Sequence, residues 1–235
     1  MTERYPGGEL ELFARARRWK AYLAAVLHPY LVGDVLEVGA GMGATTAALA
    51  DGRQRRWLCL EPDESLAKRL RQDVAAGRLP PYCQVVVGAL GDLPVAEQFD
   101  AILYIDVVEH ILRDAQELAA AARRLRPRGA LAVLAPAHQW LYSPFDAAIG
   151  HHRRYTRGSL AAIAPPELRP DILRYLDSVG LIASAANRLL LHRRLPTTRD
   201  IAVWDGWMIP VSRALDPLLR FLVGKSVLGV WRKPA

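Results

Sequence analysis

Val35-Leu36-Glu37-Val38-Gly39-Ala40-Gly41-Met42-Gly43-Ala44-Thr45-Thr46 is the stretch that decides the fold. It begins as a short apolar strand, turns through glycines and continues into a helix of small residues. Glycine tolerates positive φ and lets a ligand approach the backbone closely. The free N–H groups at the start of the next helix point at whatever lies over the turn. The pattern predicts a nucleotide-type ligand site in an α/β fold, a device that NAD-binding folds share.

Two carboxylates argue against NAD as the ligand. Glu37 stands two residues before Gly39, where it would repel a pyrophosphate and hold an ammonium group. Glu61 follows the apolar run Trp57-Leu58-Cys59-Leu60, and its distance of roughly 20 residues from the glycines suits a carboxylate that binds a ribose diol. A ligand with a ribose and an ammonium group but no pyrophosphate is S-adenosylmethionine (SAM). The alternative for Glu37 is a solvated strand end.

The stretch resembles the first motif of class I SAM-dependent methyltransferases, and later segments follow the order of that family. The resemblance implies a Rossmann-like, doubly wound, mostly parallel seven-stranded sheet with helices on both faces and an antiparallel last strand. Many members place an acid after the third strand, where this chain has Gly88-Ala89-Leu90. We therefore expect a backbone contact to the adenine there. The implied cofactor residues are Glu37, Gly39, Ala40, Gly41, Met42, Glu61, Pro62, Ala89, Leu90, Asp106 and Val107.

Hydrophobic periodicity predicts alternating strands and helices. The expected strands are Asp34–Val38, Arg56–Leu60, Cys83–Val87, Asp100–Ile105, Ala130–Ala135, Ile172–Leu176 and Ser226–Trp231. The expected helices are Leu10–Leu27, one ending near Ala50, Asp63–Ala76, one ending near Leu125, a short one capped by Ser159, Leu181–His192 and an interrupted one from Pro196 to Val223. A turn is expected at Pro127-Arg128-Gly129.

The chain has no internal repeat or low-complexity linker, so we expect a single domain over residues 1–235. Residues 1–30 would form a helical cover, in which Trp19 and Tyr22 either shield the cofactor from water or simply pack. Residues 31–136 would form the cofactor-binding core. Residues 137–235 would supply an acceptor-binding loop, lid helices and the last strands.

Composition limits the partners and the setting. The net charge of +7 fits nucleic acid, a membrane surface or a phosphorylated substrate, or merely an arginine-rich genome. The basic residues are scattered, which disfavours a nucleic-acid partner. Cys59 and Cys83 fall in predicted strands and read as buried hydrophobic residues. No signal peptide or membrane span is recognised, so a cytoplasmic setting is expected.

The aromatic, histidine-rich segment 137–158 leaves the carboxyl end of a predicted strand, and long loops of this kind are usually functional. It resembles a bacterial branch of the superfamily whose members are presumed to act on saccharides or lipid-linked glycans. Methyl transfer to a hydroxyl needs a base, and histidine suits neutral pH. The candidate catalytic residues are His151 and His152, with Tyr155 as an orienting group and His138 as a weaker candidate base. The candidate substrate-binding residues are Trp140, Tyr142, Arg154 and Asp177.

O-methylation of a small or saccharide-like acceptor is therefore the leading hypothesis, with SAM converted to S-adenosylhomocysteine (SAH). N-methylation of a small amine would need no dedicated base. A SAM-binding subunit without chemistry and a NAD-dependent oxidoreductase are two further hypotheses. The apolar region 204–221 would serve core packing or a homodimer, or else dock a lipid carrier or membrane.

Asp106-Val107-Val108-Glu109-His110 resembles the D-x-x-E-H signature of many small-molecule methyltransferases. At a helix start, Asp106, Glu109 and His110 would share a face. With His151 or His152 they would make a mixed oxygen and nitrogen metal site. Many relatives carry the same letters without a metal, so we expect no metal here.

Overall fold

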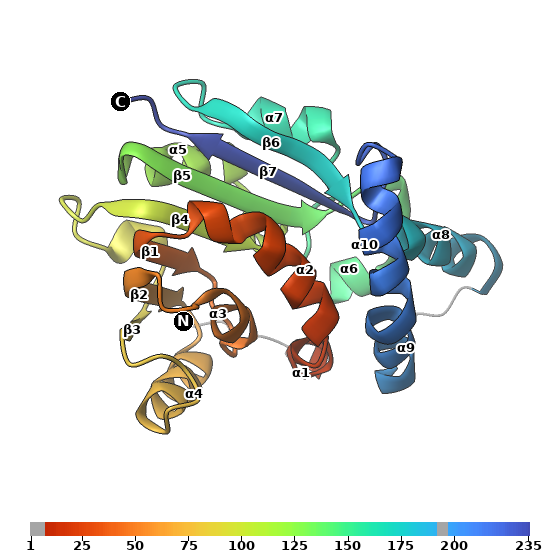
Figure 1. The fold of residues 1–235 in the computed structure, drawn as a ribbon, viewed down its shortest axis with the longest axis horizontal. Coiled ribbons are helices and arrows are strands. Elements are labelled where there is room, and N and C mark those ends of the chain that lie inside the picture. The colour runs from red at the N-terminus through yellow and green to blue at the C-terminus, as the bar shows by residue number, and fades with distance from the viewer. Residues whose placement is uncertain (1–7, 192–196) are drawn as a thin grey trace.

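The computed structural model describes residues 8–191 and 197–235. Seven strands form one sheet in the order β3-β2-β1-β4-β5-β7-β6 (Figure 1). Strands β1 to β5 pair in parallel, whereas β7 runs antiparallel to both β5 and β6. This confirms the predicted fold class. The strands are β1 Gly33–Val38, β2 Gln54–Glu61, β3 Cys83–Val87, β4 Phe99–Ile105, β5 Leu125–Pro136, β6 Arg169–Leu176 and β7 Ser226–Arg232.

Helices cover both faces of the sheet, as parallel strands buried on both sides require (Figure 1). One buried cluster joins Val35 of β1 to α2, α3 and the C-terminal helices, and a second joins Leu36 to α5 and α7. The α-helices are α1 Gly8–Ala14, α2 Arg17–Leu27, α3 Ala44–Leu49, α4 Glu64–Ala75, α5 Asp114–Arg123, α6 Pro144–Ala148, α7 Arg157–Ile163, α8 Ser178–Ala186, α9 Thr198–Val203 and α10 Ile209–Leu218. Short 3-10 turns are η1 His28–Tyr30, η2 Leu90–Asp92, η3 Val108–His110 and η4 Gln139–Leu141, and π-helical turns are η5 Asn187–Leu191 and η6 Trp204–Met208.

The predicted helix over residues 10–27 is wrong in one respect, because it is broken between Ala14 and Arg17. Asp205 caps the start of α2 by accepting hydrogen bonds from the backbone N–H groups of Arg18 (3.1 Å) and Trp19 (2.8 Å). The Lys20 ammonium donates to the Phe13 carbonyl at the end of α1. The two contacts satisfy backbone N–H groups at the start of α2 and a carbonyl at the end of α1. Asp205 is far from both helices in the sequence, so the break could not be predicted from local residues.

Strand β5 begins at Leu125, so the turn expected at residues 127–129 lies inside a strand. The register against β4 shifts there, and Arg128 has φ 65°. The C-terminal tail covers this irregularity, since the backbone N–H of Lys233 donates to the Gly129 carbonyl at 2.9 Å. The helix expected directly after Asp106 is also delayed, because η3 precedes α5.

Two further boundaries differ from expectation. Thr156, not Ser159, is the N-cap of α7, and Ser159 completes its capping box. The region 196–223 is divided into α9, η6 and α10, with Thr197 as the N-cap of α9. The expected helix ends at His192 and Pro196 lie outside the described residues.

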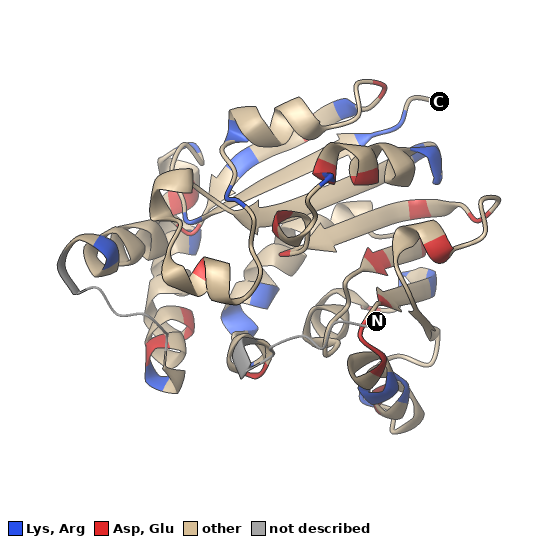
Figure 2. Ribbon diagram, turned by 180° about the vertical axis from the view of Figure 1, so that it is seen from behind, with Lys and Arg blue, Asp and Glu red and all other residues tan. Residues whose placement is uncertain are grey.

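Charge is dispersed over the molecule. Figure 2 shows Lys and Arg on many helices, loops and strand ends, with acidic segments between them. Within residues 8–191 and 197–235, no helix combines the length and apolarity needed to cross a bilayer.

Candidate active site at the carboxyl edge of the sheet

The glycine turn after β1 takes the conformation that its sequence predicts. Gly39, Gly41 and Gly43 have φ of 71°, 55° and 76°. A Cβ on Gly39 would lie 2.6 Å from Cγ2 of Val107, so a larger residue would collide with this side chain just after β4. The turn is therefore held by backbone conformation and by close packing together.

Glu37 points into the protein and is only 2% exposed. Its Oε2 accepts hydrogen bonds from Thr46 Oγ1 at 2.6 Å and Trp57 Nε1 at 2.8 Å. Burial raises the pKa of Glu37 to about 7, against the effect of these two donors. Glu37 is thus a buried carboxyl beside the glycine turn, and not a solvated strand end.

Glu61 ties the end of β2 to the glycine turn. Its Oε2 accepts from the backbone N–H of Gly41 at 2.7 Å, and its Oε1 accepts from that of Asp63 at 3.0 Å. Burial raises the pKa of Glu61 above its usual range. Pro62 is exposed next to it, and Asp63 caps α4. This arrangement places a carboxylate at the edge where a ribose would lie in the predicted site.

The turn after β3 contains an acid that was not among the predicted residues. Asp92 Oδ2 accepts from the backbone N–H of Ala89 at 2.8 Å and closes η2. Ala89 is exposed, whereas the Leu90 side chain is buried. The Ala89 amide is consequently engaged within the turn, and the acid stands two residues after Leu90, where the family pattern does not place it.

Asp106 follows β4 with φ 55° and is exposed at the sheet edge. The surrounding protein raises its pKa to about 6 by desolvation, while His151, Lys225 and Lys20 act in the opposite direction. Val107 packs under Gly39. The two lysines were not predicted from the sequence. Lys225 precedes β7, and its Nζ lies 4.7 Å from the centroid of the Trp204 ring.

His151 is oriented by Asp146. Its Nδ1 lies 3.0 Å from Asp146 Oδ1, and a carboxylate can only accept, so Nδ1 carries the proton. Asp146 also accepts from Arg154 Nε (2.8 Å) and Nη2 (3.0 Å), and from the backbone and hydroxyl of Ser143. Burial opposes ionisation of Asp146, but the hydrogen bonds from His151 and Arg154 hold its pKa well below the usual range. The other ring nitrogen, Nε2, is thus directed away from Asp146.

His151 Nε2 faces Glu109 of η3. His151 Nε2 lies 3.7 Å from Glu109 Oε1, and the Glu109 side chain is fully buried. Neither carboxylate oxygen accepts a hydrogen bond from another described residue. Burial first, and the charge of Asp106 second, raise the pKa of Glu109 well above its usual range. The rings of His110 and His151 meet edge to face at 4.6 Å.

The remaining predicted catalytic and substrate-binding residues lie in the core or on the loop after β5. The Tyr155 hydroxyl is buried and donates to Asp114 Oδ2 at 2.7 Å, while the Tyr142 hydroxyl donates to the His151 carbonyl at 2.6 Å. Asp177 is buried and accepts from Trp204 Nε1, Ser212 Oγ and the Gly180 amide, which gives it a place in the core. His152 and Trp140 are exposed on the surface of the loop, and His138 stacks on Tyr175.

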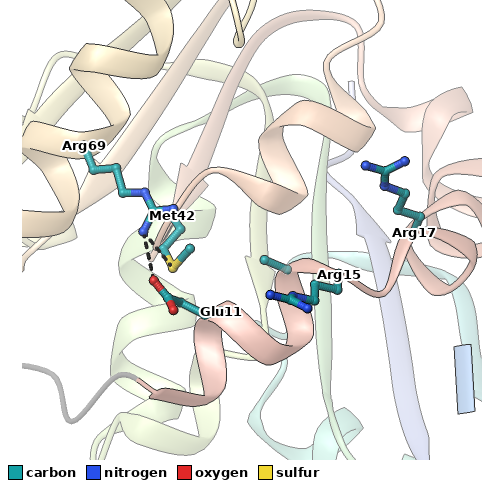
Figure 3. A pocket seen from close by; sticks show the side chains of 6 residues that line it. Glu11, Arg15, Arg17, Met42 and Arg69 are labelled. Carbon is teal, nitrogen blue, oxygen red and sulfur yellow. Dashed lines mark hydrogen bonds and ion pairs between the residues drawn. The ribbon is translucent and has the colours of Figure 1, made fainter. Parts of the chain in front are cut away.

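A pocket of about 570 Å³ opens beside the glycine turn (Figure 3). Arg69 Nη1 lies 3.4 Å from Glu11 Oε1 and 3.7 Å from the Met42 sulfur. Met42 is the one predicted cofactor residue that lines it. Three arginines make this opening basic. The lining residues are Glu11, Ala14, Arg15, Arg17, Met42 and Arg69.

A family model matches the part of the chain that contains the glycine turn. Residues 36–133 match the family model described as a methyltransferase domain. No curated protein matches the chain. The matched segment holds the glycine turn, Glu61 and the Asp106–His110 segment. It ends before the loop that carries His151.

Solved structures establish the fold. A Haloferax volcanii protein in complex with the Trm112 methyltransferase activator is 17% identical with a TM-score of 0.67, covering 99% of this chain and 98% of its own. The N-methyltransferase NodS from Bradyrhizobium japonicum WM9, in complex with SAH, is 16% identical with a TM-score of 0.59, covering 95% and 88%. The [4+2]-cyclase SpnF is 15% identical with a TM-score of 0.63, covering 92% and 82%. Residues 36–133 thus match a methyltransferase domain model, and the chain has the fold of these solved structures.

Proposed function

We propose that the protein transfers a methyl group from SAM to a hydroxyl of a small-molecule or saccharide-like acceptor. The observation that carries this proposal is the convergence of Glu37, Glu61 and Asp106 on one edge of the sheet, beside a glycine turn. They end or follow β1, β2 and β4, which are neighbours in the sheet. Ligands of open α/β sheets bind at the carboxyl ends of the strands. Residues 1–30, 31–136 and 137–235 would act as cover, cofactor half and acceptor half of one domain.

The charges at this edge suit SAM. Desolvation raises the pKa values of Glu37, Glu61 and Asp106, so a cation bound beside them would favour their ionised forms. SAM brings an ammonium and a sulfonium, which would favour the ionised carboxylates. A dinucleotide would instead bring two further negative charges. The proposed cofactor site comprises Glu37, Gly39, Ala40, Gly41, Met42, Glu61, Pro62, Ala89, Leu90, Asp106 and Val107.

His151 is our choice for the group that accepts the acceptor's proton. Asp146 holds Nδ1–H and leaves Nε2 as the basic atom, an arrangement that fixes both tautomer and ring orientation. His152 is exposed on the loop surface, and the Tyr155 hydroxyl donates to Asp114 in the core. Arg154 is assigned a positioning role through Asp146, and Tyr142 through the His151 carbonyl.

A second candidate function is N-methylation of a small amine. NodS is an N-methyltransferase, and the exposed carboxyl of Asp106 in this chain would suit an amine. A SAM-binding subunit without turnover is a third candidate. The exposed apolar residues of η6 and α10 favour a partner in that case, of which Trp207 (77%) and Leu218 (78%) are the most accessible.

The same apolar face would fit a lipid-linked acceptor. Val211 and Leu215 of α10 are also exposed, and so are Arg213 and Arg220. Apolar residues beside arginines suit an anionic lipid surface. A homodimer through this face is the competing use. Analytical ultracentrifugation and vesicle flotation distinguish the two.

The test of the proposed function is SAH formation in an acceptor screen of sugars, lipid-linked sugars and small amines. SAH should accumulate with a hydroxyl acceptor. Loss of the signal in Asp106→Ala, with the fold retained by circular dichroism, would tie turnover to this edge. Turnover on amines alone would select the second candidate, and SAM binding without turnover on any acceptor would select the third.

A further inference from the structure

We propose that Glu109, His110 and His151 bind one first-row divalent metal ion, of the Zn²⁺ or Mn²⁺ type. Each residue offers one ligand atom, and these three atoms lie within 4.8 Å of one another. Two come from η3 at the end of β4 and the third from the loop after α6, so the fold assembles the cluster from distant segments.

The spacing between Glu109 and His151 suits a bound cation. Glu109 Oε1 and His151 Nε2, which are both possible ligand atoms, face each other at 3.7 Å. That separation is too long for a hydrogen bond between them. It is close to the spacing of about 3.4 Å between two ligands of a tetrahedral zinc ion, given bonds of about 2.0–2.2 Å. A shared metal ion would thus fit between the two atoms.

Glu109 is the strongest single argument. It is fully buried, and no other described residue donates a hydrogen bond to either carboxylate oxygen. Buried polar groups are nearly always hydrogen-bonded or coordinated to a metal. The Arg154 guanidinium, which lowers the pKa of Glu109 through its charge, is already held by Asp146. A metal ion would supply the missing partner.

Both histidines have the supporting contacts typical of metal ligands. His151 donates Nδ1–H to Asp146. His110 has a hydrogen bond with the Gly150 backbone, and its Nδ1 is the nearest atom to the Cβ position of Gly150, at 3.6 Å. Metal-bound histidines generally use one nitrogen for the metal and the other for such a partner. In His151, Nε2 is then the atom that faces Glu109 and would bind the ion.

The ligand set indicates the kind of metal. Two imidazoles and one carboxylate favour zinc or another first-row transition metal over Mg²⁺, which prefers oxygen ligands. Three protein ligands leave a coordination position for an acceptor oxygen. Coordination there would make the acceptor hydroxyl more acidic. Its oxygen would then bond to the methyl carbon as the carbon–sulfur bond of SAM breaks, giving methyl ether, SAH and one released proton.

This catalytic use rests on the proposed function, whereas metal binding does not. With the ion bound, His151 Nε2 would be a ligand and the metal would take over activation of the hydroxyl. The Asp106 carboxyl, which the sequence pattern grouped with Glu109 and His110, lies outside the cluster. The inferred site therefore differs from the one expected from the D-x-x-E-H spacing.

The test is equilibrium dialysis of the chelator-treated full chain against Zn²⁺, Mn²⁺ or Mg²⁺, with metal analysis. One equivalent of Zn²⁺ or Mn²⁺ should bind per chain, and Mg²⁺ more weakly. Glu109→Gln and His151→Asn should each weaken binding at least tenfold. His152→Asn, one residue away and outside the cluster, is the matched control and should bind the ion as the wild type does.

Binding that is absent in the wild type, or unchanged in both Glu109→Gln and His151→Asn, would overturn the inference. If one variant fails to fold, the other carries the test. Asp146→Asn provides a further measurement, since loss of the partner of a metal-bound histidine typically costs about 10–100-fold in metal affinity. SAM-dependent turnover in the presence of chelator would refute the metal's role and leave the methyltransferase proposal standing. Metal binding without SAM binding would support the metal site and contradict the methyltransferase proposal.

Discussion

The Glu61 carboxylate accepts a hydrogen bond of 2.7 Å from the backbone N–H of Gly41. Its other oxygen accepts from the backbone N–H of Asp63. One side chain thus fixes the glycine turn to the end of β2. Both Glu61 oxygens already accept hydrogen bonds. A ribose diol bound here would therefore donate to a carboxylate that the two backbone N–H groups hold in place.

Glu61→Gln should weaken SAM binding. The amide of glutamine offers one acceptor oxygen in place of two, so one of the two backbone N–H groups loses its partner. A hydrogen bond from a ribose hydroxyl to the charged carboxylate would contribute about 1.5–3 kcal/mol, which corresponds to a rise in Kd of roughly 10–150-fold on its loss. Calorimetry with SAH measures it. Glu64→Gln, an exposed change in the first turn of α4, is the control, and equal affinities in the two variants would contradict the role of Glu61.

Gly39→Ala should destabilise the protein more than Gly77→Ala. Both glycines have φ near 70°, but a Cβ on Gly39 would lie 2.6 Å from Val107, whereas nothing lies within 4 Å at Gly77. Positive φ alone costs about 1–2 kcal/mol for alanine. Urea unfolding should show that cost for Gly77→Ala and a larger one for Gly39→Ala. Equal losses of unfolding free energy would mean that the Val107 side chain moves aside without destabilising the protein.

Glu37 should lower the stability as pH rises through the range of roughly 5.5 to 8. The pKa of Glu37 is about 7 in the folded protein, against an ordinary value of 4.5, so the folded state binds more protons in this interval. The free energy of unfolding therefore decreases with pH, by roughly 2 kcal/mol from this group. Raised pKa values at Glu61, Asp106 and Glu109 act in the same direction.

Glu37→Gln isolates that contribution. One oxygen accepts from both Thr46 and Trp57, so a glutamine carbonyl can keep both hydrogen bonds. The variant should be more stable than the wild type at about pH 8 and should lose part of the pH dependence of the urea midpoint. A pH dependence identical to that of the wild type would show that Glu37 is not the titrating group.

His151→Asn should lower kcat by about 10²–10⁴-fold if Nε2 accepts the proton or holds the activating ion. SAM affinity should change little, because His151 lies on the proposed acceptor loop. Asp146→Asn should reduce kcat as well, since Nδ1 loses the carboxylate that orients it. Single-turnover kinetics with saturating SAM measure these effects. A larger loss in His152→Asn than in His151→Asn would reassign the base to His152.

The sequence was sufficient for the sheet and its glycine turn, since alternating apolar strands and clustered glycines are local signals. It was insufficient where distant segments meet. Asp146 acts on His151 only because α6 and its capping box turn the loop back, although the Ser143-x-x-Asp146 spacing was a readable cue. Lys20 and Lys225 act on Asp106 from opposite ends of the chain. Asp177 follows a strand but is enclosed by Trp204 and Ser212, which no local pattern could indicate.

The most direct test of the central claim is calorimetric titration of the purified chain with SAM, SAH and NAD. We predict that SAM and SAH bind with one site per chain and that NAD does not bind. Because Glu37, Glu61 and Asp106 would ionise around the cationic cofactor, SAM should also bind more tightly at about pH 8 than at about pH 6. Binding of NAD without SAM or SAH would contradict the account and require the same edge to be reinterpreted as a dinucleotide site.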